Sequence, residues 1–225
     1  MSNHMNAGMG AGYFIAGTDT GIGKTFIASA LVRHFAQRGL KSIGMKPVAA
    51  GCELVAGQLV SEDVAQLMSA GNITAPLRTI NPYAFAPAIA PHIAAHAEGT
   101  DIELAVIHQA YTRLCSMAEM VIVEGVGGFR VPLGDSIDTA DLAQQLALPV
   151  ILVVGMRLGC ISHALLTVDA IQARGLILAG WVANTLAPRM DVLEDNIRAL
   201  KQRIPAPCLA VVGWDESPDF SALNS

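Results

Sequence analysis

The sequence predicts an α/β fold: a doubly wound, mostly parallel sheet with helices on both faces, like that of P-loop NTPases. Three observations support this fold class. Short apolar runs alternate with segments of helical period, the apolar runs are continuous rather than alternating, and a glycine-rich turn joins the first run to the first helix. Continuous apolar runs are typical of strands covered on both faces. The 225 residues, 52% hydrophobic and 15% charged, predict one domain with a large buried core.

The first half of the chain gives both regular elements and an irregular stretch. Lys24–Arg38 has helical period and stops at Gly39. Thr100 and Glu103 form a capping-box pattern that predicts a helix to about Cys115, while residues 72–99 hold four prolines and are predicted to be irregular. The other predicted elements are strands at Tyr13–Ala16 and Ser42–Val48 and a helix at Ser61–Ala70, capped by Ser61 and ended by Gly71.

The second half alternates more regularly. The run PVILVV, Pro149–Val154, indicates the clearest buried strand, and Asp138 is predicted to cap a short helix. The remaining elements are strands Met120–Val123, Leu178–Ala183 and Cys208–Val212 and helices Thr139–Leu146, Ser162–Arg174 and Met190–Arg203. Residues 1–12 lack any pattern and are predicted to form a flexible tail, which leaves 13–225 as a single domain.

Charge, hydropathy and cysteine spacing argue against several classes of protein. The net charge is −5 and no run of lysine or arginine occurs, so neither nucleic acid nor an anionic membrane surface is expected as a partner. The longest apolar stretch, Leu146–Val154, contains a proline and is far shorter than the about 20 residues that span a bilayer. Four dispersed cysteines match no metal-site pattern, and no secretory signal is recognisable. We expect a cytoplasmic protein with free thiols.

The segment GTDTGIGKT, Gly17–Thr25, predicts a phosphate-binding loop because it lies between the first strand and the first helix. Glycines let backbone N–H groups face phosphate oxygens, and the helix N-terminus adds a partial positive charge. Lys24 is expected to reach the outer phosphates and the Thr25 hydroxyl to ligate Mg²⁺. Five residues separate Gly17 from Gly23, one more than in the usual motif. The alternative is a glycine-rich turn that binds nothing.

Polar residues at the ends of neighbouring strands are expected to complete a nucleotide site. Glu124 follows Met120–Val123 and is placed to hold Mg²⁺, unless it is a solvated carboxylate. Lys46 follows an apolar approach and precedes a proline, which favours a fixed functional position over a surface charge. Asn184 could hydrogen-bond a base, although asparagine is also common in turns at strand ends.

Other conspicuous side chains have plainer interpretations. His92 and His96 have a metal-like spacing on a helix, but no third ligand is evident, so a structural or surface role is favoured. His163 is expected to cap or pack at a helix start. Trp181 is expected in the core, whereas Trp214 could border a base.

Taken together, several motifs resemble the dethiobiotin synthetase family, and the similarity runs from about residue 13 to 214. The resemblance implies a homodimeric ligase that uses MgATP to carboxylate 7,8-diaminopelargonic acid with CO₂ and to close the ureido ring, giving dethiobiotin, ADP and phosphate in biotin biosynthesis. The longer spacing in the phosphate loop is that family's own form. The motifs are GTDTGIGKT (17–25), GMKPVAAG (44–51), NPYAFAPAIAPH (81–92), VEGVGGF (123–129), LPVILVVGMRLGCISHALLT (148–167) and AGWVAN (179–184).

The resemblance also implies roles for individual residues. Thr25, Asp63 and Glu124 match the family's Mg²⁺ ligands, and Lys24 and Lys46 match its catalytic phosphate- and carbamate-binding lysines. The implied ATP-binding positions are Gly21, Ile22, Gly23, Lys24, Thr25, Phe26, Asp63, Glu124, Gly125, Val126, Gly127, Asn184, Thr185, Gly213, Trp214 and Asp215.

The implied substrate positions include a turn that belongs to the neighbouring subunit, which is the reason for a homodimer. That turn is Gly159–Ser162, whose backbone would take the substrate carboxylate. Gly21 and Ala50 depart from the glutamate and serine that the family often carries, so individual substrate contacts differ here. The implied substrate positions are Thr20, Lys46, Ala50, Gly159, Cys160 and Ser162.

A rival interpretation from another class is a P-loop switch ATPase of the partition type. Such proteins usually carry a second lysine early in the loop and often a membrane-targeting tail. Residues 17–23 contain no lysine, and the C-terminal segment 215–225 is short and polar. A nucleotide-binding module without chemistry is opposed by Lys46 and Glu124 together.

Overall fold

Six parallel strands form the central sheet, in the order β10-β9-β8-β1-β7-β2. The structure is a computed structural model that describes residues 11–221 and 223. The first strand, β1, lies in the middle of the sheet and later strands extend it to both sides, which confirms the doubly wound α/β fold. The strands are β1 Ala11–Gly17, β2 Ser42–Met45, β7 Met120–Glu124, β8 Val150–Met156, β9 Leu178–Thr185 and β10 Cys208–Val212.

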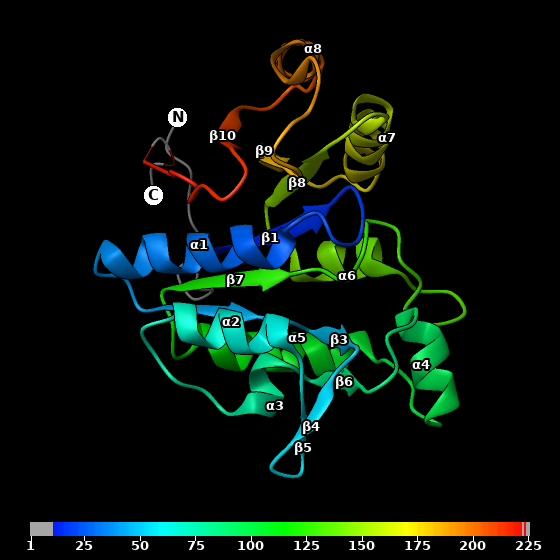
Figure 1. The fold of residues 1–225 in the computed structure, drawn as a ribbon. Helices are drawn as coiled ribbons and strands as arrows, with labels where there is room; N and C mark the ends of the chain where they lie inside the picture. Colours follow the sequence, from blue (N-terminus) through cyan, green and yellow to red (C-terminus); the bar gives the residue numbers. More distant parts are fainter. Residues whose placement is uncertain (1–10, 222, 224–225) are drawn as a thin grey trace.

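Helices cover both faces of this sheet (Figure 1). Successive strand residues point to opposite faces, so Ile15 packs in the cluster that contains α1 and Phe14 in the cluster opposite. Trp181 is fully buried in the latter cluster, as expected from its place in a strand. One face carries α1 Lys24–Gln37 and α2 Glu62–Ala70, and the other carries α5 Leu104–Cys115, α6 Thr139–Leu146, α7 Cys160–Ala173 and α8 Leu193–Arg203.

Residues 72–99 are not irregular throughout, so that prediction is wrong in part. They contain α3 Leu77–Ile80, β6 Tyr83–Phe85 and α4 Pro91–Ala97. A second element that the sequence did not reveal is the hairpin of β4 Glu53–Val55 and β5 Gln58–Val60, which projects at the bottom of Figure 1. Its turn residues Ala56 and Gly57 both have positive φ, and alanine is an uncommon choice there.

The predicted strand Ser42–Val48 is two strands instead. After β2, the Lys46 N–H donates to the carbonyl of Ile80 at 3.0 Å, outside the main sheet. Pro47 has no N–H to continue the ladder. The chain then forms β3, Val48–Ala50, which pairs in parallel with β6. Because of this break, Lys46 lies outside both strands, at the carboxyl end of β2.

Two of the three predicted helix caps are confirmed. The Ser61 hydroxyl accepts from the Val64 N–H at 3.2 Å, and Asp138 makes a full capping box with Asp141. The capping box at Thr100 and Glu103 is wrong, because Glu103 itself precedes α5 and makes no side-chain cap. Its backbone N–H donates instead to the Tyr83 hydroxyl at 3.0 Å, a tertiary contact that the local pattern does not contain.

Several element boundaries also differ from the predictions. β1 begins at Ala11, since residues 11 and 12 pair with Met120 and Val121, and residues 1–10 of the expected tail lie outside the described residues. Glu124 is the last residue of β7 and does not follow it. α7 begins at Cys160, two residues before the predicted start, after Gly159 at φ 92°. α8 begins at Leu193 because Val192 has φ 51° and cannot belong to the helix.

Two further properties bear on the expected class of protein. Over residues 11–221 and 223, every helix is too short or too polar to traverse a bilayer. All four cysteines lie in that part of the chain, and each is a free thiol.

Candidate functional site

The loop between β1 and α1 has the backbone that the sequence predicts for a phosphate-binding loop. Gly21 and Gly23 have φ of 70° and 85°, which only glycine adopts readily. Gly23 stands directly before α1 and packs so closely against Asn184 that an added Cβ would lie 2.3 Å from its Nδ2 atom. That Nδ2 atom donates to the carbonyl of Ile22 at 2.8 Å. Asn184 therefore holds the loop from the end of β9.

Lys24 folds back over this loop. Its Nζ atom donates to the carbonyl of Asp19 at 2.7 Å, and the side chain is buried. An added Cβ at Gly17 would lie 2.8 Å from the Lys24 side chain, so a larger residue there would displace the lysine where it passes the end of β1. The ammonium thus lies above the loop, where the phosphates of a nucleotide would be held.

Lys46 lies between two carboxylates. Its Nζ atom is 2.6 Å from Glu124 Oε1 and 2.8 Å from Asp63 Oδ2. Lys46 and Glu124 are 4% and 1% exposed, whereas the Asp63 side chain is 43% exposed and opens the cluster to solvent. These residues come from the ends of β2 and β7 and from the first turn of α2. The structure thus brings together three of the predicted site residues, Lys46, Asp63 and Glu124.

Thr25 joins the phosphate loop to this cluster. Its hydroxyl donates to Glu124 Oε1 at 2.7 Å. The second oxygen of the carboxylate, Oε2, is buried and has no hydrogen-bond partner among the described residues. A buried carboxylate oxygen without a partner is costly, so its retention points to a ligand. The three predicted Mg²⁺ ligands, Thr25, Asp63 and Glu124, therefore lie close together, and Glu124 Oε2 is available to bind a ligand.

The charges in the cluster influence one another. Burial opposes the charge of Lys46, but the attraction of Glu124 and Asp63 outweighs it and raises the pKa of the lysine. Burial likewise opposes the charge of Asp63, yet the Lys46 ammonium lowers the pKa of this carboxyl. Burial, and then repulsion by Lys46, lower the pKa of Lys24 to about 8. The attraction of nearby acids, Asp19 and Asp63 among them, opposes the lowering at Lys24 but does not outweigh it.

A cavity of about 840 Å³ contains these groups. Part of its lining is polar, from the phosphate loop, Lys46 and the two acids, and part is apolar, from residues 88–91, Val126 and Val131. Among the predicted substrate positions, Thr20, Lys46 and Ala50 lie here. The lining residues are Thr20, Gly21, Gly23, Lys24, Thr25, Phe26, Lys46, Ala50, Asp63, Gln66, Ala88, Ile89, Ala90, Pro91, Glu124, Val126, Gly127 and Val131.

A second cavity of about 590 Å³ shares Gly21, Gly23 and Phe26 with the first. Asn184 and Trp214 both contribute to its lining, so the structure brings together the residues expected on the base side. The predicted residues among its lining are Gly21, Gly23, Phe26, Asn184, Thr185, Gly213, Trp214 and Asp215, joined by Leu186, Glu216 and Ser217. Ile22 and Gly125 line neither cavity. The Ile22 carbonyl accepts a hydrogen bond from Asn184, and the Gly125 carbonyl accepts one from Lys46 at 3.4 Å.

The turn Gly159–Ser162 is the predicted segment that the chain does not bring to either cavity. Cys160 is buried in the core, and its N–H already donates to the carbonyl of Arg157 at 3.0 Å. A ligand at this helix start would therefore meet the N–H groups of Ile161 and Ser162 and not that of Cys160.

Three residues near the site were missed by the sequence analysis. Arg157 forms an ion pair with Asp19 of the phosphate loop, and Asn81 donates to the carbonyl of Lys46 at 2.7 Å, which fixes the strand break there. Gln66 follows Asp63 by three residues, so helical spacing could have indicated that it faces the same cavity. The first two contacts join distant segments and leave no local signal.

The histidine pair lies apart from this site. His92 and His96 line a third cavity of about 580 Å³ together with Asp101 and Asp135. Nowhere in the described part of the chain do three or more histidine, cysteine or acidic side chains converge closely enough to hold a metal ion. The structural or surface role favoured for the two histidines stays a prediction.

The donors around Glu124 fit a hard cation. Mg²⁺ prefers oxygen ligands and usually takes one or two carboxylates, with water and phosphate oxygens completing its shell. Glu124 Oε2, the Asp63 carboxylate and the Thr25 hydroxyl form such a set beside the phosphate loop. These three residues could hold Mg²⁺, and the two cavities together could hold a nucleoside triphosphate.

Comparisons with known proteins give a family and a fold. The AAA domain family model matches residues 11–220. The ATP-dependent dethiobiotin synthetase BioD of Aromatoleum aromaticum is 58% identical over 89% of each chain. That of Nitrosospira multiformis is 52% identical over 97% of this chain and 95% of its own.

Similar solved structures show the fold alone, because their sequence identity is low. The ParA family ATPase from Chlorobium tepidum has a TM-score of 0.52 at 14% identity, covering 93% of this chain and 86% of its own. The MinD cell division protein of Aquifex aeolicus has a TM-score of 0.53 at 11% identity, covering 90% and 81%.

The fit between Gly23 and Asn184 predicts different effects for two glycine substitutions. Both Gly21→Ala and Gly23→Ala impose a left-handed alanine, which costs about 1–2 kcal/mol. Only Gly23→Ala also drives a methyl group into Asn184. We expect roughly 2–5 kcal/mol of destabilisation for Gly23→Ala, since overpacking adds about 1–3 kcal/mol. Urea unfolding of the nucleotide-free protein measures both values, and equal losses would show that Asn184 moves aside without cost.

Proposed function

The chain belongs to the ATP-dependent dethiobiotin synthetase family, and we propose that it converts 7,8-diaminopelargonic acid, CO₂ and ATP to dethiobiotin, ADP and phosphate. The observation that carries the proposal is the buried Lys46 ammonium, which lies beside the phosphate loop and lines the same cavity as several apolar residues. A cation in that position can stabilise the negative charge of a phosphoryl group on one side and of an anionic substrate on the other.

The reaction needs positioning more than a protein nucleophile. One substrate amine adds to CO₂ and loses a proton, giving a carbamate. A carbamate oxygen attacks the γ-phosphorus of ATP, and the bond to ADP breaks. The second amine then attacks the carbamoyl carbon, the ureido ring closes and phosphate leaves. The lining of the larger cavity, which lies in the described part of the chain, contains no serine, cysteine or histidine, in agreement with such chemistry.

We assign complementary roles to the two lysines. Lys24 binds the phosphates of ATP, because its ammonium lies over the loop that would cradle them. Lys46 acts where the new bond forms, between the carbamate and the γ-phosphate. Negative charge moves from the carbamate to ADP during transfer, so a fixed cation there stabilises mainly the transition state.

Mg²⁺ is part of the proposal, with Thr25, Asp63 and Glu124 as its protein ligands. When bound, the ion would neutralise phosphate charge that transfer moves onto ADP. In the structure the Lys46 ammonium lies between the same two carboxylates. We propose that this ammonium balances the charge of the two carboxylates in the nucleotide-free protein. When a metal–nucleotide complex binds and its metal ion balances that charge instead, the ammonium would turn toward the substrates.

The base of the nucleotide is proposed to occupy the second cavity, next to Asn184 and Trp214. The Asn184 amide nitrogen already donates to the carbonyl of Ile22, so its oxygen is the atom oriented for a base amine. Trp214 is 47% exposed on the cavity wall and offers a ring face or edge. Gly21, which stands where the family often carries glutamate, lines both cavities and brings no charged side chain to either.

A homodimer is proposed because the turn before α7 has no part in either cavity of its own chain. Leu158 is 99% exposed and Leu166 is largely exposed, which gives this surface an apolar character suited to a second copy. The N–H groups of Ile161 and Ser162 would then meet the carboxylate of the substrate in the partner's site. The expected cytoplasmic location and the expected lack of nucleic-acid and membrane partners stay predictions.

The rival function is a partition-type switch ATPase. The resemblance to ParA and MinD structures concerns the fold alone. A switch hydrolyses ATP to change its own association, so its turnover does not require a diamine. Substrate dependence of ATP turnover therefore separates the two functions.

The first prediction concerns that dependence. ADP release should require both diaminopelargonic acid and bicarbonate as the source of CO₂, because the carbamate is the group that accepts the phosphoryl. A coupled assay for ADP, run with each component omitted in turn, measures it. ATP hydrolysis at the same rate without the diamine would favour the switch.

The second prediction separates the lysines. Lys46→Ala should lower kcat by about 10²–10³ while ATP affinity changes little, since the lost charge acts mainly in the transition state. Lys24→Ala should lose both ATP affinity and kcat. Lys46→Arg should restore only part of the rate, because a planar guanidinium cannot replace a compact ammonium in a buried site. Calorimetry with ATP beside steady-state rates tests this. Normal turnover of Lys46→Ala would reduce Lys46 to a structural charge.

The third prediction concerns the metal. Glu124→Gln and Asp63→Asn should each raise the Mg²⁺ concentration for half-maximal activity by about tenfold or more, since each removes a charged oxygen ligand. Glu62→Gln is the matched control, because Glu62 neighbours Asp63 but is exposed and bonded to Gln66. Circular dichroism checks the fold. An unchanged Mg²⁺ requirement in both variants would remove these carboxylates from the metal site.

The fourth prediction tests the shared site by complementation. Lys46→Ala damages the site of its own chain, and Ser162→Arg should damage the site of the partner. A mixed dimer would contain one intact site, so mixing the two inactive variants should restore activity, up to about a quarter of the wild-type level after random exchange. Light scattering gives the oligomeric state. No recovery on mixing dimeric variants, or a fully active monomer, would contradict the proposal.

A further inference from the structure

The segment after β10 is anchored at both ends. At its start, Val212 is buried and pairs with Asn184 of β9. Farther along, Phe220 is only 2% exposed and belongs to the same buried cluster as Leu31 and Phe35 of α1. Its ring meets His34 of α1 edge-on, with ring centroids 6.2 Å apart. The C-terminal segment is thus packed onto α1.

The residues between these anchors form one wall of the second cavity. Residues 213–217 line it. A turn hydrogen bond links the Glu216 N–H to the Gly213 carbonyl at 3.2 Å, and Asp215 has a left-handed φ of 58°. Left-handed φ is uncommon for non-glycine residues, although aspartate tolerates it better than most. The wall thus connects the two anchors.

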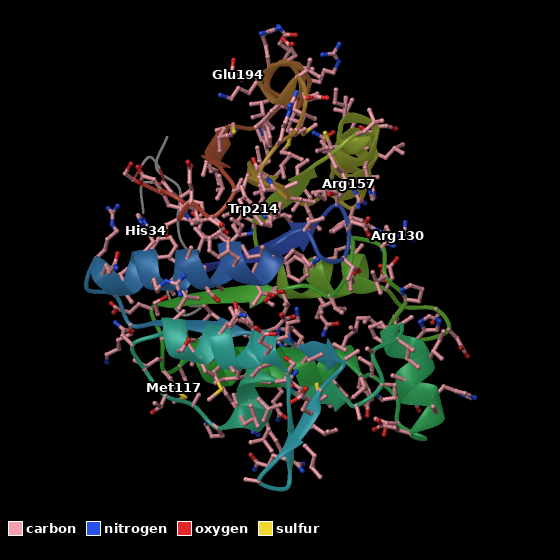
Figure 2. All side chains as sticks on the ribbon, viewed as in Figure 1. His34, Met117, Arg130, Arg157, Glu194 and Trp214 are labelled. Atoms are coloured by element: carbon pink, nitrogen blue, oxygen red, sulfur yellow. The ribbon has the colours of Figure 1, made fainter. Side chains whose placement is uncertain are left out.

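The second anchor connects this wall to the phosphate loop. α1 begins with Lys24 and Thr25, and the same helix carries His34 three turns later. Figure 2 shows His34 and Trp214 on the side of α1 that faces the C-terminal segment. Because α1 is rigid, a group packed on it keeps a fixed distance from the loop that precedes it. Helix α1 thus positions both the phosphate loop that precedes it and the base-side wall, residues 213–217.

We propose that Phe220 is a positioning residue for nucleotide binding: by packing on α1 it sets the base-side wall at the distance from the phosphate loop that a nucleoside triphosphate requires. The inference rests on the proposed function in one respect, namely that a nucleotide fills the two cavities. Phe220 lines neither of them and acts through the wall.

The proposal predicts a selective loss. Phe220→Ala should weaken ATP binding by about tenfold, because the wall must then be ordered at the expense of binding energy. Inorganic tripolyphosphate contacts only the phosphate loop, so its affinity should stay within about twofold of the wild-type value. Phe220→Leu retains an apolar side chain and should restore most of the ATP affinity. KM for ATP should rise in Phe220→Ala with kcat little changed.

The experiment measures the affinity of each full-length variant for ATP and for tripolyphosphate by calorimetry. Leu114→Ala is the control, since Leu114 is fully buried in the cluster on the other face of the sheet and its loss destabilises the fold without touching the wall. Acrylamide quenching of tryptophan fluorescence reports on Trp214, because Trp181 is buried, and quenching should rise in Phe220→Ala alone.

The ratio of the two affinities decides the outcome. An unchanged ratio in Phe220→Ala, or the same change in Leu114→Ala, would overturn the positioning role while leaving the proposed function intact. Failure of the wild-type protein to bind ATP would overturn both. If Phe220→Ala does not fold, Phe220→Val, which keeps more of the apolar packing, replaces it. The same ratio of ATP affinity to tripolyphosphate affinity then decides the outcome.

Discussion

A buried ammonium between two carboxylates is the interaction on which the rest of the site depends. Lys46 contacts Glu124 at 2.6 Å and Asp63 at 2.8 Å. Lys46 directly follows β2, Glu124 ends β7, and Asp63 lies in the first turn of α2. Removing Lys46 would leave the buried Glu124 carboxylate without a compensating charge, which costs several kcal/mol. The cluster therefore fixes the ends of β2 and β7 relative to α2 before any ligand arrives, and Thr25 extends it to the phosphate loop.

Parallel topology explains why these groups meet. β1, β7 and β2 are neighbours, with Ile15 opposite Glu124 and Met45 opposite Val123. The residues that follow all three strands consequently emerge at one edge of the sheet, which is where ligands bind in open α/β folds. The break at Pro47 then turns Lys46 toward Glu124. The chemistry proposed for the site thus follows from strand order and from one interruption in a strand.

The same topology explains how far sequence alone could predict the molecule. The phosphate loop, Lys46 and Glu124 could be predicted because each directly adjoins a recognisable strand. Asp63 came only from the family resemblance, since an acid in a first helical turn carries no signal of its own. The capping box predicted at Thr100 is wrong because the Glu103 N–H donates to the Tyr83 hydroxyl, which is distant in the sequence. Contacts such as Phe220 on α1 likewise exist only once the chain is folded.

The most direct test of the account is the affinity of the nucleotide-free protein for Mn²⁺, used as a spectroscopic substitute for Mg²⁺. If the Lys46 ammonium balances the charge of Glu124 and Asp63, replacing it in Lys46→Met should leave two carboxylates that attract a cation. Electron paramagnetic resonance titration should then show Mn²⁺ binding about tenfold tighter in the variant than in the wild-type protein. Equal or weaker binding by a folded Lys46→Met variant would contradict the account.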